Sequence, residues 1–384
     1  MRYSFGFLCA CALGLLPFVG CGDTNVTVYC GTDGAGGSGG SGGAIGDAFP
    51  CTEQGIVDAI AEGGGPHTFA CVGPTTVTTE AEIVIDNDVI LDGEGNLTVD
   101  AGGEHADSMD DHRVFSVPEG VTAELHRIAV TGAGFPPPQE GERGIVNLGT
   151  LTLSNSLVFG NLGGGIFNAG ILTIRDVSFS NNGTTRSDGL DGGGIFNNGT
   201  LTVTNATISG NSAIGGGGGI LNAGEGTASV VNSTISGNRA SAEGGGISNE
   251  GTLTMTNCTL SGNVSDEQQG SAVAAVASRT IMLSSTLIDG DCQGPLTSNG
   301  YNIESPGNTC GFDQQGDQSG VSAVLLDLQP LADNGGPTQT HAITTDSAAL
   351  NAGTCEVDED QRGVTRPQGP ACDVGAFERQ PEDP

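Results

Sequence analysis

The first residues that could do chemistry are carboxylates gathered at residues 102–113, in the segment GGEHADSMDDHR. Asp107, Asp110 and Asp111 lie close together there, and carboxylate oxygens are ligands that Ca²⁺ prefers. Their spacing differs from that of a regular calcium-binding loop. Two interpretations stay open, a calcium site and a solvated loop between two turns of the fold, and the sequence favours the loop.

A second acidic segment, TTRSDGLDGGG at residues 184–194, contains Asp188 and Asp191 beside Arg186. The combination resembles the polysaccharide lyases that bind calcium through aspartates and use an arginine or lysine as base. Arginine needs a strongly perturbed pKa for that task, and the chain contains no lysine. An ordinary loop is the favoured interpretation. No cofactor is required by either acidic segment, and calcium is the one ion that both would suit.

A third group of charges alternates in sign near the end of the chain, among prolines and glycines. We interpret it as a structural ion-pair network. It consists of Asp360, Arg362, Arg366, Asp373 and Glu378. The sequence supports neither a nucleophile elbow nor a phosphate-binding glycine loop, because the run GGGGG from Gly215 is not followed by a helical pattern. We therefore predict no catalytic residues.

The chain contains eleven cysteines, of which Cys9 and Cys11 belong to an apolar leader. Export would place the remainder in an oxidising compartment, where disulfides form. Three close pairs suggest themselves, and each would close a loop worth about 3 kcal/mol. They are Cys51 with Cys71, Cys292 with Cys310, and Cys355 with Cys372. Cys30 and Cys258 are left over, and no cysteine or histidine grouping has zinc spacing.

The elements that position these residues are set by an internal repeat, G-I-x-N-x-G, followed each time by a strand pattern such as TLTVTNATISGN. The copies begin at Gly144, Gly165, Gly194, Gly219 and Gly246. Apolar residues two positions apart indicate strands with one buried face, and identical faces in every copy indicate strands stacked in parallel. The sequence therefore predicts an all-β fold, a right-handed parallel β-helix of about nine turns.

Aligning the copies gives polar columns as well as apolar ones. One register contains Asn155, Asp176, Asn205, Asn232 and Asn257, and we expect the asparagine amides to form a hydrogen-bonded ladder along the coil axis that Asp176 interrupts. The next register accepts only small side chains, so Cys258 is expected to be buried and unreactive.

The chain begins MRYSFGFLCACALGLLPFVGC, which has the charged start and apolar run of a signal peptide. Gly20 before Cys21 resembles a bacterial lipobox, so we expect a lipid on Cys21; cleavage to a free secreted product is the alternative. The chain is therefore expected to be exported and membrane-anchored, as a lipoprotein of the bacterial cell envelope at the outer membrane or cell surface.

Both ends of a coil must be covered, because each exposes an apolar disc. We expect a short amino-terminal capping helix with Ile56, Val57, Ile60 and Ala61 on its buried face, and a disulfide-bridged carboxyl-terminal cap. The predicted organisation is a signal peptide at 1–20, a glycine- and serine-rich tether at 21–50, the first cap at 51–74, repeats at 75–291 and the second cap at 292–384.

The end of the chain reads QPLADNGGPTQTHAITTDSAALNAGTC and then DEDQRGVTRPQGPACDVGAFE. With SNGYNIESPGNTCGF and the repeats, it resembles the choice-of-anchor Q family of exported bacterial β-helix proteins over roughly residues 51–378. The resemblance implies the fold and export, and it carries no catalytic residues.

The formal net charge of −34 disfavours nucleic acid and anionic lipid headgroups as partners, and it suits neutral glycans or divalent cations. Two functions remain open. The first is an adhesin-like, non-catalytic module for glycan or surface contact, and the second is a polysaccharide lyase or glycoside hydrolase on the same scaffold. Membrane contact would come through the lipid, and the sequence leaves the ligand and oligomeric state unspecified.

Overall fold

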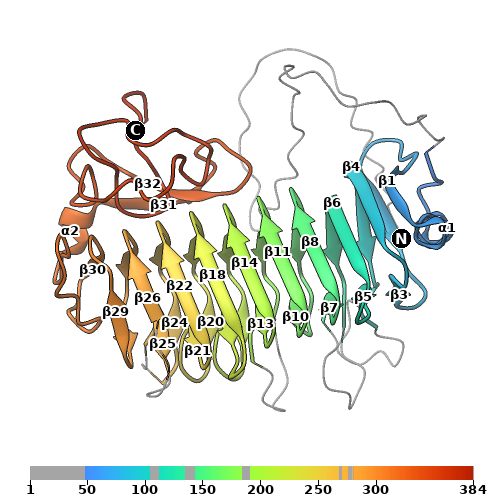
Figure 1. Cartoon of the computed structure of the whole chain (residues 1–384), viewed down its shortest axis with the longest axis horizontal. Coiled ribbons are helices and arrows are strands. Elements are labelled where there is room, and N and C mark those ends of the chain that lie inside the picture. Colours follow the sequence, from blue (N-terminus) through green and yellow to red (C-terminus); the bar gives the residue numbers. More distant parts are fainter. Residues whose placement is uncertain are drawn as a thin grey trace, which may run out of the picture. The chain divides into compact units, whose positions relative to one another are not determined.

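The structure is a computed structural model that describes residues 48–103, 112–134, 143–183, 191–267, 270–275, 279 and 281–383. These residues form a right-handed parallel β-helix, in which each strand pairs in parallel with the equivalent strand of the next coil (Figure 1). The predicted fold class is confirmed. Among the described residues, no helix has the length and apolar character that crossing a bilayer requires.

Each regular coil has three strand positions. The first contains β3 (Ile83–Val84), β5 (Phe115–Val117), β7 (Ile145–Asn147), β10 (Ile166–Asn168), β13 (Ile195–Asn197), β17 (Ile220–Asn222), β21 (Ile247–Asn249), β25 (Val273–Ala275) and β28 (Cys292–Gln293). The second contains β8 (Thr150–Ser154), β11 (Ile171–Arg175), β14 (Thr200–Thr204), β18 (Thr227–Val231), β22 (Thr252–Thr256), β26 (Ile281–Ser284) and β29 (Leu296–Ser298). The third contains β9 (Leu157–Phe159), β12 (Ser178–Ser180), β15 (Thr207–Ser209), β19 (Thr234–Ser236), β23 (Thr259–Ser261), β27 (Leu287–Asp289) and β30 (Ile303–Ser305).

In the early coils β4 (Val89–Asp100) and β6 (Thr122–Thr131) span the second and third positions together, and β1 (Gly64–Thr68) and β2 (Thr75–Thr78) pair with β4. A short sheet of β16 (Ser212–Ala213), β20 (Arg239–Ala240) and β24 (Val264–Ser265) follows the third position in the later coils. The hairpin of β31 (Leu328–Ala332) and β32 (Thr340–Ile343) is antiparallel.

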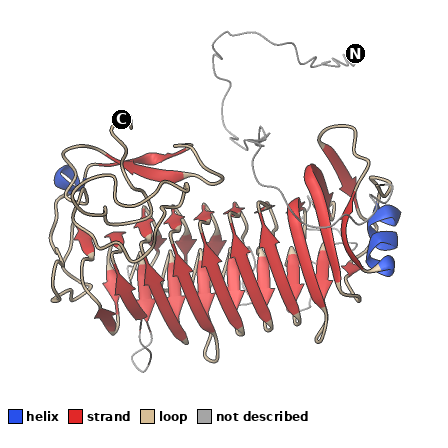
Figure 2. Cartoon of the chain, turned by 45° about the horizontal axis from the view of Figure 1, so that its top comes forward, coloured by secondary structure: helices blue, strands red, loops and turns tan. Residues whose placement is uncertain are grey.

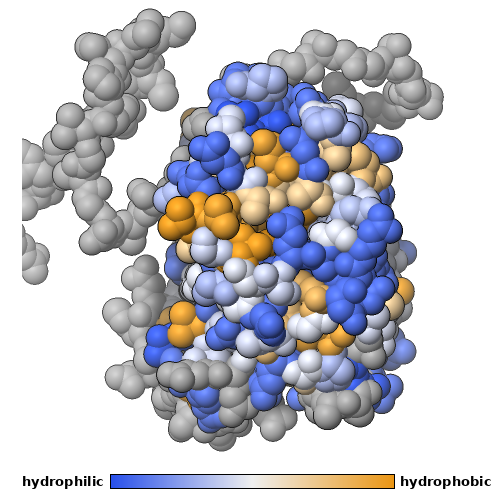
Figure 3. Space-filling model, turned by 90° about the vertical axis from the view of Figure 1, so that its left-hand side faces the viewer, coloured by the Kyte–Doolittle hydropathy of each residue, from blue (hydrophilic) through white to orange (hydrophobic). Residues whose placement is uncertain are grey.

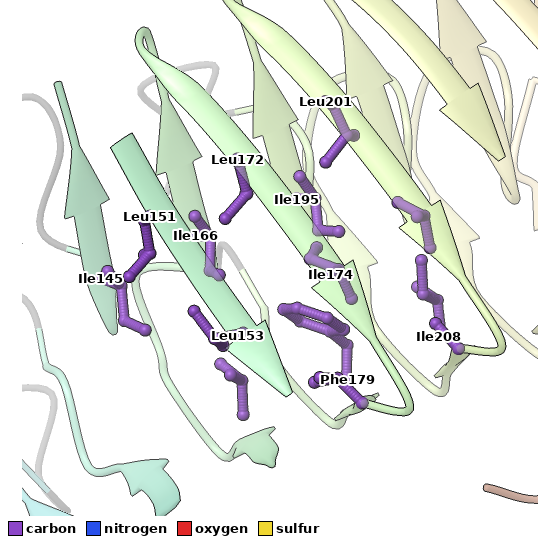
Figure 4. Close-up of a cluster of buried hydrophobic side chains, with 14 of the residues drawn as sticks. Ile145, Leu151, Leu153, Ile166, Leu172, Ile174, Phe179, Ile195, Leu201 and Ile208 are labelled. Carbon is purple, nitrogen blue, oxygen red and sulfur yellow. The ribbon is translucent and has the colours of Figure 1, made fainter. Parts of the chain in front are cut away.

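The core is built from the predicted apolar columns. Ile166, Ile195, Ile220 and Ile247 pair in sequence along β10, β13, β17 and β21, and all four side chains are fully buried. The second and third strand positions contribute further columns in the same way (Figure 4). Burying such aliphatic side chains stabilises the fold by about 1.5–3 kcal/mol each, which offsets the scarcity of large aromatic residues.

Two buried asparagine ladders run along the coil, one at each asparagine marker of the repeat. In each, Nδ2 of one asparagine donates to Oδ1 of its copy on the next coil. The first ladder joins Asn147, Asn168, Asn197, Asn222 and Asn249 at 2.7 Å per step. The second joins Asn161, Asn182, Asn211, Asn238 and Asn263 at 2.9 Å per step.

The ladder that we expected in a third column is therefore misplaced. Of its members Asn155, Asp176, Asn205, Asn232 and Asn257, the structure joins one pair, Asn205 to Asp176 at 3.1 Å. The amide of Asn257 has no hydrogen-bond partner, and that of Asn232 donates to Glu359 O. All five have a positive φ of 46–57° because they form the turn between the second and third strand positions. Asparagine and aspartate tolerate this left-handed conformation better than other residues with a side chain, which explains the column.

The first glycine of each repeat lies against the backbone of the next coil. A Cβ on Gly194 would lie 2.6 Å from Gly219 O, and one on Gly219 would lie 2.7 Å from Gly246 O. Both distances are shorter than side-chain carbons tolerate, so the glycine of the motif is required by the closeness of the stacked coils.

The amino-terminal cap is α1 (Glu53–Glu62), which the predicted Cys51–Cys71 disulfide links to the following segment. Thr52 Oγ1 accepts a hydrogen bond from Gly55 N and so caps the helix. Ile56 and Ile60 are buried as expected. The prediction was wrong for Val57, which is 41% exposed, and for Ala61, because the buried face contains Ala59 in their place.

The coil continues beyond the predicted boundary at residue 291, since β29 pairs with β26 and β30 pairs with β27. The predicted disulfides Cys292–Cys310 and Cys355–Cys372 are both present. Residues 306–383, which we call the C-terminal lobe, include α2 (Ala323–Leu326) and the β31–β32 hairpin. Figure 3 views this end and shows apolar patches among hydrophilic residues. The apolar side chains Val324 and Leu325 of α2 are exposed.

The C-terminal lobe lies along the side of the coil as well as at its end (Figure 1). Three outward-facing threonines of the third strand position bind it. Gln361 Nε2 donates to Thr207 Oγ1 at 3.0 Å, Thr234 Oγ1 donates to Gln361 Oε1 at 2.7 Å, and Ala376 N donates to Thr259 Oγ1 at 3.0 Å. All three threonines are buried as a result.

The predicted ion-pair network lies inside this lobe. Arg366 Nη1 is 3.0 Å from Glu378 Oε2 and Arg362 Nε is 2.9 Å from Asp360 Oδ2, with all four residues almost fully buried. The Arg362 guanidinium also lies over the Phe377 ring, 3.6 Å from its centroid. These charges fix the lobe internally, and removing one member would leave its partner uncompensated.

The first ladder predicts a large effect of one buried amide. Replacing Asn197 with Ala would remove its bonds to Asn168, Asn222 and nearby carbonyls, and should lower the free energy of unfolding by about 3 kcal/mol. The exposed neighbour of Asn197 gives the control, because Asn198→Ala should change the free energy of unfolding by less than about 0.5 kcal/mol. Guanidinium unfolding followed by circular dichroism measures both, and equal effects would contradict the role of the ladder.

The lobe also predicts a pH dependence. Burial lowers the pKa of His341, opposed by its bond to Gln329 O and by the charge of Asp289. The unfolded chain therefore binds a proton first, and stability should fall as the pH drops below about 6.5. His341→Asn should flatten the pH dependence of the unfolding temperature between pH 7 and pH 5 relative to the unmodified chain. An unchanged slope would show that the burial of His341 in the lobe does not account for the pH dependence of the unfolding temperature.

Candidate functional site

The outward side chains of the second strand position form one continuous face of the coil. The long strands that carry them lie side by side along its length (Figure 2). Because the strands are in register, outward residues form rows that cross the sheet. One row contains Asp92, His126, Ser154, Arg175, Thr204, Val231 and Thr256.

At the β6–β8 end of this face, Ser154, His126 and Glu124 form a hydrogen-bonded chain, which we call the serine–histidine–glutamate cluster. Ser154 Oγ lies 2.5 Å from His126 Nδ1. His126 Nε2 lies 2.9 Å from Glu124 Oε2. A hydroxyl, an imidazole and a carboxylate in series are the parts of an activated nucleophile.

The fold holds this cluster by strand geometry alone. Glu124 and His126 are two positions apart on β6, so both point outward. His126 and Ser154 are direct partners across the β6–β8 pair. Ser154 is the last residue of β8, and the chain turns at Asn155 immediately after it. The Ser154 residue is 7% exposed, whereas the His126 and Glu124 side chains are 31% and 39% exposed.

Charged residues flank the cluster on both sides. Arg127 Nε donates to Asp92 Oδ1 at 2.9 Å in an ion pair beside His126. Partial burial acts to raise the pKa of Asp92, but the hydrogen bonds from Arg127 and Glu94 N outweigh it, so the net pKa is lowered. On the other side, exposed Arg175 is the strand partner of Ser154. The cluster therefore has an ionised carboxylate on one flank and a guanidinium on the other.

The same face changes character over β14, β18 and β22. We call the outward residues of these strands the threonine face. It consists of Thr200, Thr202, Thr204, Thr227, Ser229, Val231, Thr252, Thr254 and Thr256. None of these residues is charged, and all are exposed or half-buried. Their register is unbroken from strand to strand.

Most of the carboxylates suggested as calcium ligands lie outside the described residues: Asp107, Asp110, Asp111 and Asp188. Asp191 is described, and its Oδ1 accepts a hydrogen bond from Gly216 N at 2.8 Å. Partial burial raises its pKa, opposed by that bond and by Arg143. In the described part of the chain, no group of three or more histidine, cysteine, aspartate or glutamate residues could hold a metal ion.

Arg143, near Asp191, is 2% exposed and donates to Gly192 O and Asp191 O at 2.5 Å. Its burial lowers its pKa to about 10, against the attraction of Asp191. A guanidinium enclosed in this way holds the backbone of residues 191–192 in place and is not accessible to a substrate.

Cys258 is the free cysteine of the described residues, and it is buried in the small-residue column as predicted. Burial raises the pKa of its thiol to about 12, so it remains protonated and is a poor nucleophile. The lipidation residue Cys21 and the leftover Cys30 lie outside the described residues.

We did not predict the serine–histidine–glutamate cluster from the sequence. The signal that could have found it is the alignment of two copies, because TAELH (Thr122–His126) pairs with TLTLS (Thr150–Ser154) residue by residue. That register places His126 directly beside Ser154. The histidine stands where later copies have serine, arginine, threonine or valine, so the column alone did not mark this position.

No protein-family model matches the chain, and no curated protein matches it. Among solved structures, the crystal structure of pectate lyase Pel9A is similar to 84% of this chain and 90% of its own, with a TM-score of 0.48 and 14% sequence identity. A likeness at this level carries no information about activity.

Proposed function

We propose that the protein is an exported, lipid-anchored surface protein of the choice-of-anchor Q type, whose β-helix body binds neutral glycans without cleaving them. The leader and Cys21 support the anchor, and the repeats and carboxyl-terminal motifs support the kinship. The threonine face is the binding surface.

The observation that carries this proposal is the absence of charge on the threonine face. The chain has 45 acidic residues, 11 basic residues and a net charge of −34, yet none of these nine outward positions has a charged side chain. An anionic ligand would be repelled by the surrounding protein, and a cationic one would find no partner on this face. An uncharged, hydroxyl-bearing polymer meets neither penalty.

The spacing of the face also suits a polymer with regular hydroxyl groups. Equivalent side chains recur about every 4.8 Å between coils and about every 6.6 Å along a strand. Each threonine offers a hydroxyl that donates and accepts hydrogen bonds and a methyl group that packs against the C–H face of a sugar ring. The β-branched side chains have few rotamers, so little conformational entropy is lost on binding.

The alternative of a polysaccharide lyase has less support from the described residues. An arginine base needs a lowered pKa and access to the substrate. Burial lowers the pKa of both Arg143 and Arg366, but contacts inside the protein engage each guanidinium. Arg143 donates to Asp191 O and Gly192 O, and Arg366 donates to Gly375 O and the Glu378 carboxylate.

Charge placed on the threonine face should weaken binding. The double variant Thr202→Glu, Thr254→Glu puts two carboxylates in one row, on either side of Ser229, and should weaken binding to insoluble neutral polysaccharides at least about tenfold, because each charge would be desolvated on contact. Depletion of the protein from solution by the polysaccharide measures the effect. Ser178→Glu, on the outward side of β12, is the matched control. Binding equal to that of the control would refute the face as the site.

The anchor is tested separately on Cys21. In a bacterial host the mature protein should begin at Cys21 and carry the added mass of a diacylglycerol, and Cys21→Ser should release the protein into the soluble fraction. Intact-protein mass spectrometry with membrane fractionation distinguishes lipidation from cleavage to a free product. Cleavage alone would leave both the unmodified protein and the Cys21→Ser variant in the soluble fraction.

A further inference from the structure

The tautomer of His126 follows from its two partners. A neutral imidazole donates through one nitrogen and accepts through the other. The carboxylate of Glu124 can only accept, so His126 Nε2 carries the hydrogen at 2.9 Å from Glu124 Oε2. Nδ1 is then the accepting nitrogen, and the Ser154 hydroxyl donates to it at 2.5 Å. The base is therefore directed at the hydroxyl.

We propose that this cluster is an ester-hydrolysing site, with Ser154 as nucleophile, His126 as general base and Glu124 as the residue that positions His126. The proposal adds a reaction to the binding role above, and it rests on different residues of the same sheet. Each contact that a Ser–His–carboxylate mechanism needs in the free protein is present, although the two ring nitrogens are exchanged relative to the serine proteases.

The reaction proceeds in two balanced steps. Ser154 Oγ attacks the ester carbonyl carbon while its proton passes to His126 Nδ1. The tetrahedral intermediate then collapses, the bond to the alcohol oxygen breaks, and His126 returns the proton to that alcohol. Water next attacks the acyl-serine and gives a proton to His126 Nδ1. The second tetrahedral intermediate collapses, the bond to Ser154 Oγ breaks, and His126 returns the proton to Oγ as the carboxylic acid leaves. No oxidant, reductant or metal ion is consumed.

The negative charge that develops on the carbonyl oxygen needs a positive partner. The backbone N–H next to the nucleophile is not free for it, since Asn155 N donates to Arg175 O at 3.1 Å. The side chain of Arg175 is the alternative. It is exposed on the neighbouring strand, directly beside Ser154 in the register. We assign the oxyanion contact to its guanidinium.

The position of the cluster indicates the class of substrate. It lies on the outward side of an open sheet, so the ester is expected to be carried by a polymer or surface that lies across that sheet. Only 7% of Ser154 is exposed, which favours a small acyl group such as acetyl. A single strand, β11, separates β8 from the threonine face at β14. An acylated neutral glycan is the substrate class that fits both regions.

The test uses the full chain, 4-nitrophenyl acetate as substrate and a fluorophosphonate probe that labels activated serines. The unmodified protein should hydrolyse the ester, and peptide mass spectrometry should find the label on Ser154. Ser154→Ala should remove the label and lower kcat/KM at least about 100-fold, and His126→Gln should do the same. Glu124→Gln should lower kcat with little change in KM, because it disturbs only the orientation of the base. Ser178→Ala is the control and should match the unmodified protein.

Three results would overturn the proposal: no hydrolysis by the unmodified protein, label on another serine, or undiminished activity in Ser154→Ala. Labelling of the unmodified protein does not depend on how any variant folds, and thermal unfolding of each variant checks that its coil is intact. The Ser154→Ala variant should still bind neutral polysaccharide that carries no acyl group. The proposed hydrolysis at Ser154 and the proposed binding at the threonine face can therefore be refuted separately.

Discussion

The structure depends on one constraint: each coil must repeat the backbone of the coil beneath it about 4.8 Å away. A buried polar group then has its own copy as nearest neighbour, and asparagine meets this condition because its amide both donates and accepts. The two ladders, through Asn197 and Asn211 among others, satisfy side chains that would otherwise each cost about 1–3 kcal/mol. The same closeness leaves room only for glycine at Gly194 and Gly219. Asparagine and glycine are thus abundant for a shared reason.

Repetition also decides how much of the fold could be predicted. The isoleucine column and the small-residue register around Cys258 followed from alignment alone, because burial acts on them equally in every copy. The three disulfides followed from the closeness of the paired cysteines in the sequence. We predicted the ladder in the wrong column because asparagine occupies three columns, two for its amide and one for its backbone conformation. Asn197 is selected for its amide, whereas Asn205 is selected for a positive φ, and the sequence does not distinguish the two.

The attachment of the C-terminal lobe was beyond prediction for a similar reason. Thr234 of β19 and Thr254 of β22 are both outward threonines, in successive coils, yet Thr234 is fully buried against Gln361 and Thr254 remains partly exposed. The contact joins residues 127 positions apart, and no pattern within the repeat marks it. Which outward face is covered was therefore learned only from the structure.

Positions that break a column are the ones that repetition does not explain. Threonine recurs on the outward side because its branched side chain fits a strand, so the threonine face could arise from packing preference alone. His126, Ser154 and Arg175 have no such explanation, since each departs from the threonine that stands at that position in β14 and β22. The stacking of the coil does not require a base beside a hydroxyl and a guanidinium on three successive strands. The cluster is for that reason the part of this face where chemistry, and not stability, accounts better for the residues present.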